Sequence, residues 1–122
     1  MRAACYSAAG PASEVLRIVE RPVPTPLPNE VLVRVYASGV NPSDVKTRRS
    51  GAAYPEVIPH SDGAGIIEAV GAGVNPRRIG ERVWLWNAAW KRAHGTAAEY
   101  VAVPARQAGE LPTNTSFVEG AC

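Results

Sequence analysis

The distribution of glycine and proline is the feature that most limits what this chain can fold into. Eleven glycines and eleven prolines are spread over 122 residues, and they separate short apolar runs from one another. Both residue types interrupt helices, and their presence between short apolar runs is typical of strands joined by turns. The segment 21–30, RPVPTPLPNE, contains four prolines. It cannot take part in a strand ladder, so we expect an extended connection there.

Seven apolar runs have the length and composition of strands. In the clearest one, EVLVRVYASG, Val31, Val33 and Val35 fall on one face, while Arg34 and Tyr36 fall on the other. This alternation predicts a half-buried strand. Six or seven short strands with almost no helix predict a mainly β fold, either a small, partly open β-barrel or a sandwich. The runs are 1–7, 14–20, 30–39, 65–71, 82–87, 97–104 and 107–112.

One internal segment carries the signals of a helix. In VNPSDVKTRRSG, Asn41 suits the N-cap position, Pro42 suits the first helical position, and Asp44 falls in the first turn, where negative charge is stabilised. Gly51 suits the C-terminal cap. We therefore expect a helix of two to three turns set among the strands.

A second helix signal lies at the end of the sequence. Ser116 and Glu119 have the spacing of a capping box, and Cys122 follows about one turn later. An isolated turn of helix is not stable in water. We therefore expect this helix to continue into further sequence.

Composition excludes several classes of function. A hydrophobic fraction of 46% and a mean hydropathy of −0.10 describe an ordinary globular protein, and no apolar run approaches the roughly 18–20 residues of a membrane span. No segment resembles a signal peptide, so we expect a cytoplasmic protein. The net charge of +2 is too small to indicate nucleic-acid binding.

The cysteine pattern indicates neither a metal knuckle nor a disulfide framework. Only Cys5 and Cys122 are present, at opposite ends of the chain. Cys5 lies in an apolar run, and the simplest interpretation is a small buried side chain.

The stretch His60–Gly73, HSDGAGIIEAVGAG, raises the question of a dinucleotide-binding loop. Its glycines lie at 63, 65, 71 and 73. A nucleotide loop needs a strand before the glycines and a helix after them, whereas Gly65 is followed by a strand pattern. We therefore predict that Gly63 and Gly65 permit close backbone approach or a bulge, and that Gly71 and Gly73 turn the chain.

In order along almost the entire chain, five segments resemble the N-terminal, GroES-like half of medium-chain dehydrogenase/reductases. Within that superfamily they are most similar to the zinc-independent quinone oxidoreductases of the zeta-crystallin type. The resemblance implies a GroES-like, partly open β-barrel over 1–114, with 115–122 starting a helix toward a cofactor-binding Rossmann domain that these residues do not contain. The segments are SGVNPSDVK, IPHSDGAGIIEAVGAGV, IGERVWL, GTAAEYVAVP and LPTNTSFVEGA.

The resemblance also implies that no zinc is bound. Zinc alcohol dehydrogenases have a cysteine at the position of Asn41 and a histidine at the position of Ser61. An amide and a hydroxyl are poor zinc ligands, and the cysteines for a structural zinc are missing too. His60 and His94 stand alone, so we interpret them as structural.

The implied activity is transfer of hydride from NADPH to a quinone or an α,β-unsaturated carbonyl compound. In the family, the NPSD helix start faces the nicotinamide, which makes Asn41, Asp44 and Lys46 the candidate catalytic residues. Asn41 and Asp44 are also the candidate cofactor contacts. Many relatives have tyrosine where Lys46 stands, so this lysine either donates a hydrogen bond to an anionic oxygen or lies exposed on the helix. Ser61 and Trp90 are the candidate substrate-binding residues.

The tryptophans leave two interpretations open. Trp84 and Trp86 share a strand face, so either could belong to the core. Trp90 lies in the loop between strands, where it could stack on a flat aromatic substrate or form an aromatic lid over the end of the barrel.

Alternative functions follow from the same resemblance. The segment could be a stand-alone GroES-like binding or assembly module, which its oligomeric mass would reveal. A reductase could also act on acryloyl-thioester or crotonyl-type substrates. Because most NADPH contacts belong to the further domain, we expect these residues alone to be inactive and the longer protein to be a homodimer.

Overall fold

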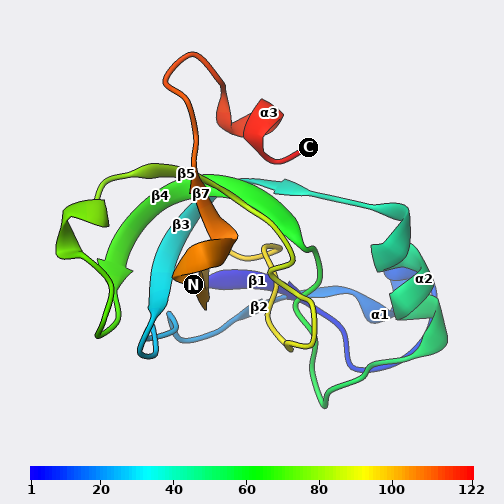
Figure 1. Ribbon diagram of the computed structural model, residues 1–122. Coiled ribbons are helices and arrows are strands. Elements are labelled where there is room, and N and C mark those ends of the chain that lie inside the picture. Colours follow the sequence, from blue (N-terminus) through cyan, green and yellow to red (C-terminus); the bar gives the residue numbers. More distant parts are fainter.

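The structure is built on two antiparallel sheets (Figure 1). The computed structural model describes all residues, 1–122. The strands are β1 (Arg2–Cys5), β2 (Arg17–Glu20), β3 (Glu30–Gly39), β4 (Asp62–Val70), β5 (Arg82–Leu85), β6 (Tyr100–Pro104) and β7 (Ala108–Glu110). The helices are α1 (Ala12–Val15), α2 (Pro42–Ser50) and α3 (Phe117–Gly120), with 3-10 turns η1 (Pro76–Arg78) and η2 (Ala105–Gln107). The predicted mainly β fold of seven strands is confirmed.

The larger sheet has the strand order β6-β3-β4-β5-β7, and β1 and β2 form a separate two-stranded ribbon. Register shifts between Leu32 and Val33, and between Val35 and Ala37, interrupt the pairing of β3 with β4. Such bulges bend a strand and increase its twist, so the sheet curls around its core. The end strands β6 and β7 do not pair with each other, which leaves the barrel partly open.

The main core lies on the concave face of this sheet. Its inward positions alternate along β3 and β6, as the sequence pattern predicted for β3, and neighbouring strands add further aliphatic side chains. The buried cluster consists of Val31, Val33, Ile67, Val83, Leu85, Ala88, Val101, Val103 and Ala108.

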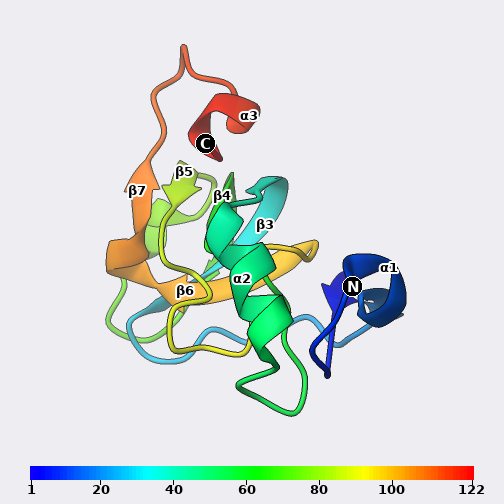
Figure 2. The ribbon, with the colours of Figure 1, turned by 90° about the vertical axis from the view of Figure 1, so that its right-hand side faces the viewer.

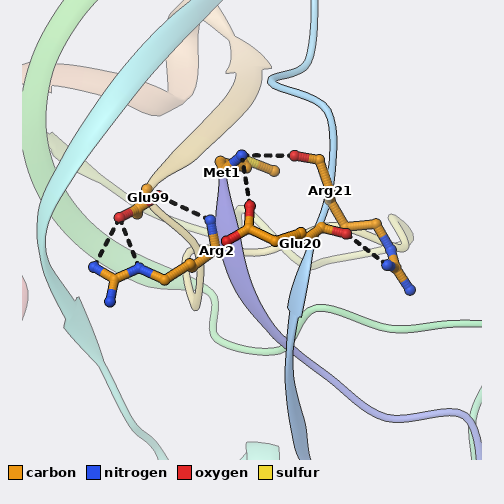
Figure 3. Close-up of polar contacts among 5 residues, drawn as sticks. All are labelled: Met1, Arg2, Glu20, Arg21 and Glu99. Carbon is orange, nitrogen blue, oxygen red and sulfur yellow. Dashed lines mark hydrogen bonds and ion pairs between the residues drawn. The ribbon is translucent and has the colours of Figure 1, made fainter.

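Polar contacts hold the N-terminal ribbon together and attach it to the rest of the domain (Figure 3). The amino group of Met1 donates to the carbonyl oxygen of Arg21 at 2.7 Å and lies 3.5 Å from the Glu20 carboxylate. The backbone N–H and guanidinium of Arg2 donate to both carboxylate oxygens of Glu99, at 2.8–3.1 Å. The ribbon is thereby joined to the segment that enters β6.

Close backbone approach, predicted for Gly63 and Gly65, is found at Gly65 and also at Gly71, while Gly73 has the turn conformation predicted for it, with φ of 85°. A Cβ atom at Gly65 would overlap the carbonyl oxygen of Arg34, and one at Gly71 would overlap that of Leu27. Strand β4 begins earlier than predicted, at Asp62 rather than Gly65, so Gly63 also lies within the strand.

The predicted strand 14–20 is wrong over its first half. Glu14 and Val15 belong to α1, in which the N–H of Val15 donates to the Pro11 carbonyl. The physical reason is the length of the partner strand, because β1 pairs only with Arg17–Glu20 and leaves residues 14–16 without a ladder.

Helix α2 forms where the capping signals predicted it. Asn41 stands at the N-cap with extended backbone angles, and Gly51 ends the helix with φ of 125°. Figure 2 shows α2 on one side of the barrel, away from α3. It buries none of its residues, so polar contacts at its ends hold it in place.

Helix α3 folds back onto the sheet. Ala121 is buried against Ala64 and Leu111, and the Phe117 ring stacks on Tyr36 with 4.7 Å between the ring centroids. None of the helices is long and apolar enough to cross a membrane, since the longest, α2, has nine residues.

Candidate active site

A cleft of about 580 Å³ opens between α2 and two loops. One loop, 51–61, leads from α2 into β4, and the other, 86–96, follows β5. Its walls combine apolar side chains with several hydroxyl groups. The lining residues are Tyr6, Ser43, Asp44, Thr47, Ala53, Tyr54, Val57, Pro59, Ser61, Asn87, Ala89, Trp90, Lys91 and Arg92.

The cleft brings together three of the five residues that the sequence selected. Asp44, Ser61 and Trp90 line it, although they lie in three different segments of the chain. Lys46 does not line it and instead borders a shallower hollow beside Gly51. Asn41 is the N-cap residue of α2 and does not line the cleft, although Ser43 and Asp44 do.

Asn41 joins the start of α2 to the start of β4. Its side-chain amide donates to Asp62 Oδ2 at 2.6 Å. Its backbone N–H donates to Asp44 Oδ2 at 2.7 Å, which is the reciprocal half of a capping box. The predicted helix start is confirmed, and the amide makes a bridge to Asp62 in addition.

His60 belongs to a hydrogen-bonded chain of side chains behind the cleft. Its Nδ1 lies 2.9 Å from Ser38 Oγ, which lies 2.8 Å from Thr96 Oγ1. The Thr96 hydroxyl donates to the Asp62 carbonyl at 2.6 Å. Burial lowers the pKa of His60, and the Asp44 carboxylate offsets part of that effect.

The backbone of His60 is in the left-handed region, with φ of 76°. This conformation is uncommon for a residue other than glycine. A side chain at Gly95 would overlap the carbonyl oxygen of His60, so the facing chain must be glycine for the two backbones to approach this closely.

Trp90 is 61% exposed, and the ammonium of Lys91 lies 4.6 Å from its ring centroid. One face of the indole therefore already holds a cation. Trp84 and Trp86 are 42% and 38% exposed, so the interpretation of these two as core residues is wrong. The Trp84 ring instead covers Gly109 on the neighbouring strand β7.

Arg92 anchors the loop that carries Trp90. Its Nη2 donates to Glu30 Oε1 at 2.8 Å and to the Ala102 carbonyl at 3.0 Å. Glu30 is only 8% exposed, and its other carboxylate oxygen accepts from the Leu27 N–H. The pair thus links the loop to the sheet and to the proline-rich segment.

Comparison with known proteins identifies the family of this domain. Residues 27–113 match the family described as Alcohol dehydrogenase GroES-like domain. The chain belongs to this family. The match covers β3 to β7 together with α2, so it includes both loops of the cleft. The GroES-like fold expected from the sequence is therefore confirmed.

Several relatives resemble this GroES-like domain. The chain is 48% identical over 71 residues to the starvation-sensing protein RspB of Escherichia coli, which covers 56% of the chain and 21% of that protein. It is 34% identical over 102 residues to the quinone oxidoreductase of Rattus norvegicus, covering 81% of the chain and 30% of the relative. The chain thus spans less than a third of either protein.

Among solved structures, the quinone oxidoreductase from Coxiella burnetii superposes with a TM-score of 0.88 at 29% identity. The superposition covers 99% of this chain and 40% of that one.

The donor set of the GroES-like domain does not suit zinc. Zinc sites in proteins use thiolate, imidazole or carboxylate ligands. The amide of Asn41 acts as a donor to Asp62, and Ser61 offers only a hydroxyl. No group of three histidine, cysteine, aspartate or glutamate side chains lies close enough to hold a metal ion.

Sequence reasoning missed Tyr6, Tyr54 and Asn87 as lining residues. Asn87 has φ of 52°, a turn conformation that asparagine tolerates. Tyr6 carries no local signal, because it follows an ordinary apolar strand and reaches the cleft only through the fold.

Proposed function

We propose that this domain is the substrate-binding half of a zinc-independent oxidoreductase that transfers hydride from NADPH to quinones or α,β-unsaturated carbonyl compounds. The observation that carries the proposal is the hydrogen bond from Asn41 to Asp62, 2.6 Å long. In the zinc alcohol dehydrogenases of the same superfamily, a thiolate occupies the position of this amide. A reductase without a metal needs an electrophile that accepts hydride readily, and conjugated carbonyl compounds meet that need.

The cleft offers the contacts that such a substrate requires. Trp90 presents an exposed indole face for a flat conjugated ring, and the Ser61 hydroxyl can donate to a substrate oxygen. Ala53, Val57 and Pro59 add apolar wall. NADPH, when bound, would supply the hydride. The resulting anion takes one proton from water, at oxygen to give the hydroquinone or at the α-carbon to give the saturated carbonyl compound.

The role of α2 in this proposal is to hold its first turn beside the cofactor. Asp44 Oδ2 accepts from the backbone of Asn41, and Asn41 in turn is held by Asp62. The two polar side chains therefore keep the helix start in one position. Lys46 lies on the exposed side of the helix and has no catalytic role in this proposal.

The test uses the protein produced from this coding sequence together with the sequence downstream of Cys122. We expect a GxGxxG- or AAxGGVG-type loop within about thirty residues of that point. We also expect this protein to oxidise NADPH with a quinone acceptor at a rate that chelators do not change. Loss of activity on chelation, with recovery on adding Zn²⁺, would contradict the proposal.

A further inference from the structure

Tyr6 occupies a rigid position in the wall of the cleft. Its backbone N–H donates to the Val57 carbonyl at 3.0 Å, and the N–H of Val57 donates back to the Tyr6 carbonyl at 2.9 Å. The residue is only 3% exposed. Its ring is therefore held by packing and by this two-way bridge to the loop that leads into β4.

The Tyr6 hydroxyl makes no hydrogen bond with any protein group. No fully buried side-chain nitrogen or oxygen in the domain lacks a partner, so this hydroxyl must reach open space. Tyr6 borders two hollows, the cleft and a smaller one beside Cys5.

Tyr6 lines the cleft together with Val57 and Pro59, and the charged groups that act on its hydroxyl belong to the cleft side. Burial raises the pKa of Tyr6, while Arg48 lowers it and Asp44 raises it to a smaller extent. Both charged residues belong to α2, which lines the cleft and takes no part in the smaller hollow. With its pKa raised, the phenol is protonated at neutral pH and acts as a hydrogen-bond donor.

We propose that Tyr6 is a substrate-binding residue whose hydroxyl donates a hydrogen bond to a carbonyl oxygen of a flat ligand in the cleft. This inference rests on the proposed function and adds a contact to it. A polar donor at a fixed position in a largely apolar wall orients a ligand, because leaving the donor unpaired on ligand binding costs free energy.

The experiment titrates the 122-residue chain with duroquinone, whose fully substituted ring limits addition to the exposed thiol of Cys122. Backbone amide shifts of the cleft residues report the Kd. We expect Tyr6→Phe to raise the Kd about three- to tenfold, which is the size of one neutral hydrogen bond, without changing the spectrum elsewhere. Tyr100→Phe is the matched control, because Tyr100 lies on β6 and lines a different hollow.

A second measurement does not depend on the variant. In the wild-type chain, the ring Cζ resonance of Tyr6 should shift as duroquinone saturates the cleft, while that of Tyr100 should not. Binding that Tyr6→Phe leaves unchanged, or a Cζ resonance that does not move, would overturn this inference alone. Failure of the wild-type chain to bind duroquinone would overturn both this inference and the proposed substrate site.

Discussion

The amide of Asn41 donates a 2.6 Å hydrogen bond to the carboxylate of Asp62 and so ties the first residue before α2 to the first residue of β4. The two residues are 21 positions apart. The contact joins the two ends of the segment that contains α2 and the loop 51–61. Because α2 buries no residue, this bond is a main attachment of the helix to the sheet.

Replacing Asn41 should therefore loosen α2. We expect Asn41→Ala to lower the free energy of unfolding by about 1.5 kcal/mol, the value of a hydrogen bond to a charged partner. Asn41→Asp should cost more, since two carboxylates would then face each other. Urea unfolding measures both, with the exposed Asn114→Ala as control. Stability equal to that of the control would show that the bond contributes nothing.

Gly65 should tolerate no side chain. Its Cβ would overlap the Arg34 carbonyl, which is backbone and cannot rotate away. We expect Gly65→Ala to destabilise the domain by about 3 kcal/mol or more in urea unfolding. Gly63→Ala is the comparison, because its nearest neighbours, Thr96 and the Ala37 carbonyl, lie 3.0–3.1 Å from the added Cβ, whereas the Arg34 carbonyl lies 2.0 Å from a Cβ at Gly65. A smaller loss at Gly65 than at Gly63 would contradict the packing argument.

The ion pair of Arg92 and Glu30 should hold the Trp90 loop. Arg92→Ala leaves a mostly buried carboxylate without its partner, and we expect a loss of about 2 kcal/mol. This lies below the value for a fully buried pair because the guanidinium is partly exposed. Adding Glu30→Gln should recover part of the loss and should slow amide exchange in the loop again. If the double variant recovered no stability, the loss in Arg92→Ala would not come from an unpaired Glu30 carboxylate.

His60 should make stability depend on pH. Burial lowers its pKa in the folded state, so below about pH 6.5 the unfolded chain takes up a proton before the folded one does. The His60 contribution is complete above that pH and is lost as the pH falls to the folded pKa. Unfolding midpoints between pH 7.5 and 5 should fall less in His60→Asn, a residue that tolerates positive φ, than in the wild type. An equal fall in the two proteins would contradict this assignment to His60.

Trp90 should contribute to binding flat ligands. On the proposed function, Trp90→Leu removes the stacking face and should raise the Kd for duroquinone about two- to tenfold. Trp86→Leu is the matched control, because Trp86 is also exposed but does not line the cleft. Equal effects of the two substitutions would indicate nonspecific contact with exposed indoles.

Local sequence signals predicted most strands and the capped helix. They failed where secondary structure depends on whether another strand lies alongside to pair with. The capping residues around 41–51 define α2 by themselves, because a helix start and end depend on neighbours within a few positions. Residues 14–16 have a strand-like composition, yet no ladder partner reaches them. Trp84 lies in an apolar strand pattern that suits a core position, but its face of the sheet is partly exposed to solvent.

The sequence alone determined the mainly β class, the helix after Asn41, the backbone role of the glycines and the family resemblance, since all of these depend on residue type and short spacing. Only the tertiary structure decided that Asp44, Ser61 and Trp90 share one cleft while Lys46 lies outside it. It also placed Tyr6 in that cleft and gave Asn41 its partner. Burial and partnership are properties of chain segments that meet in space, and no local pattern encodes which segments meet.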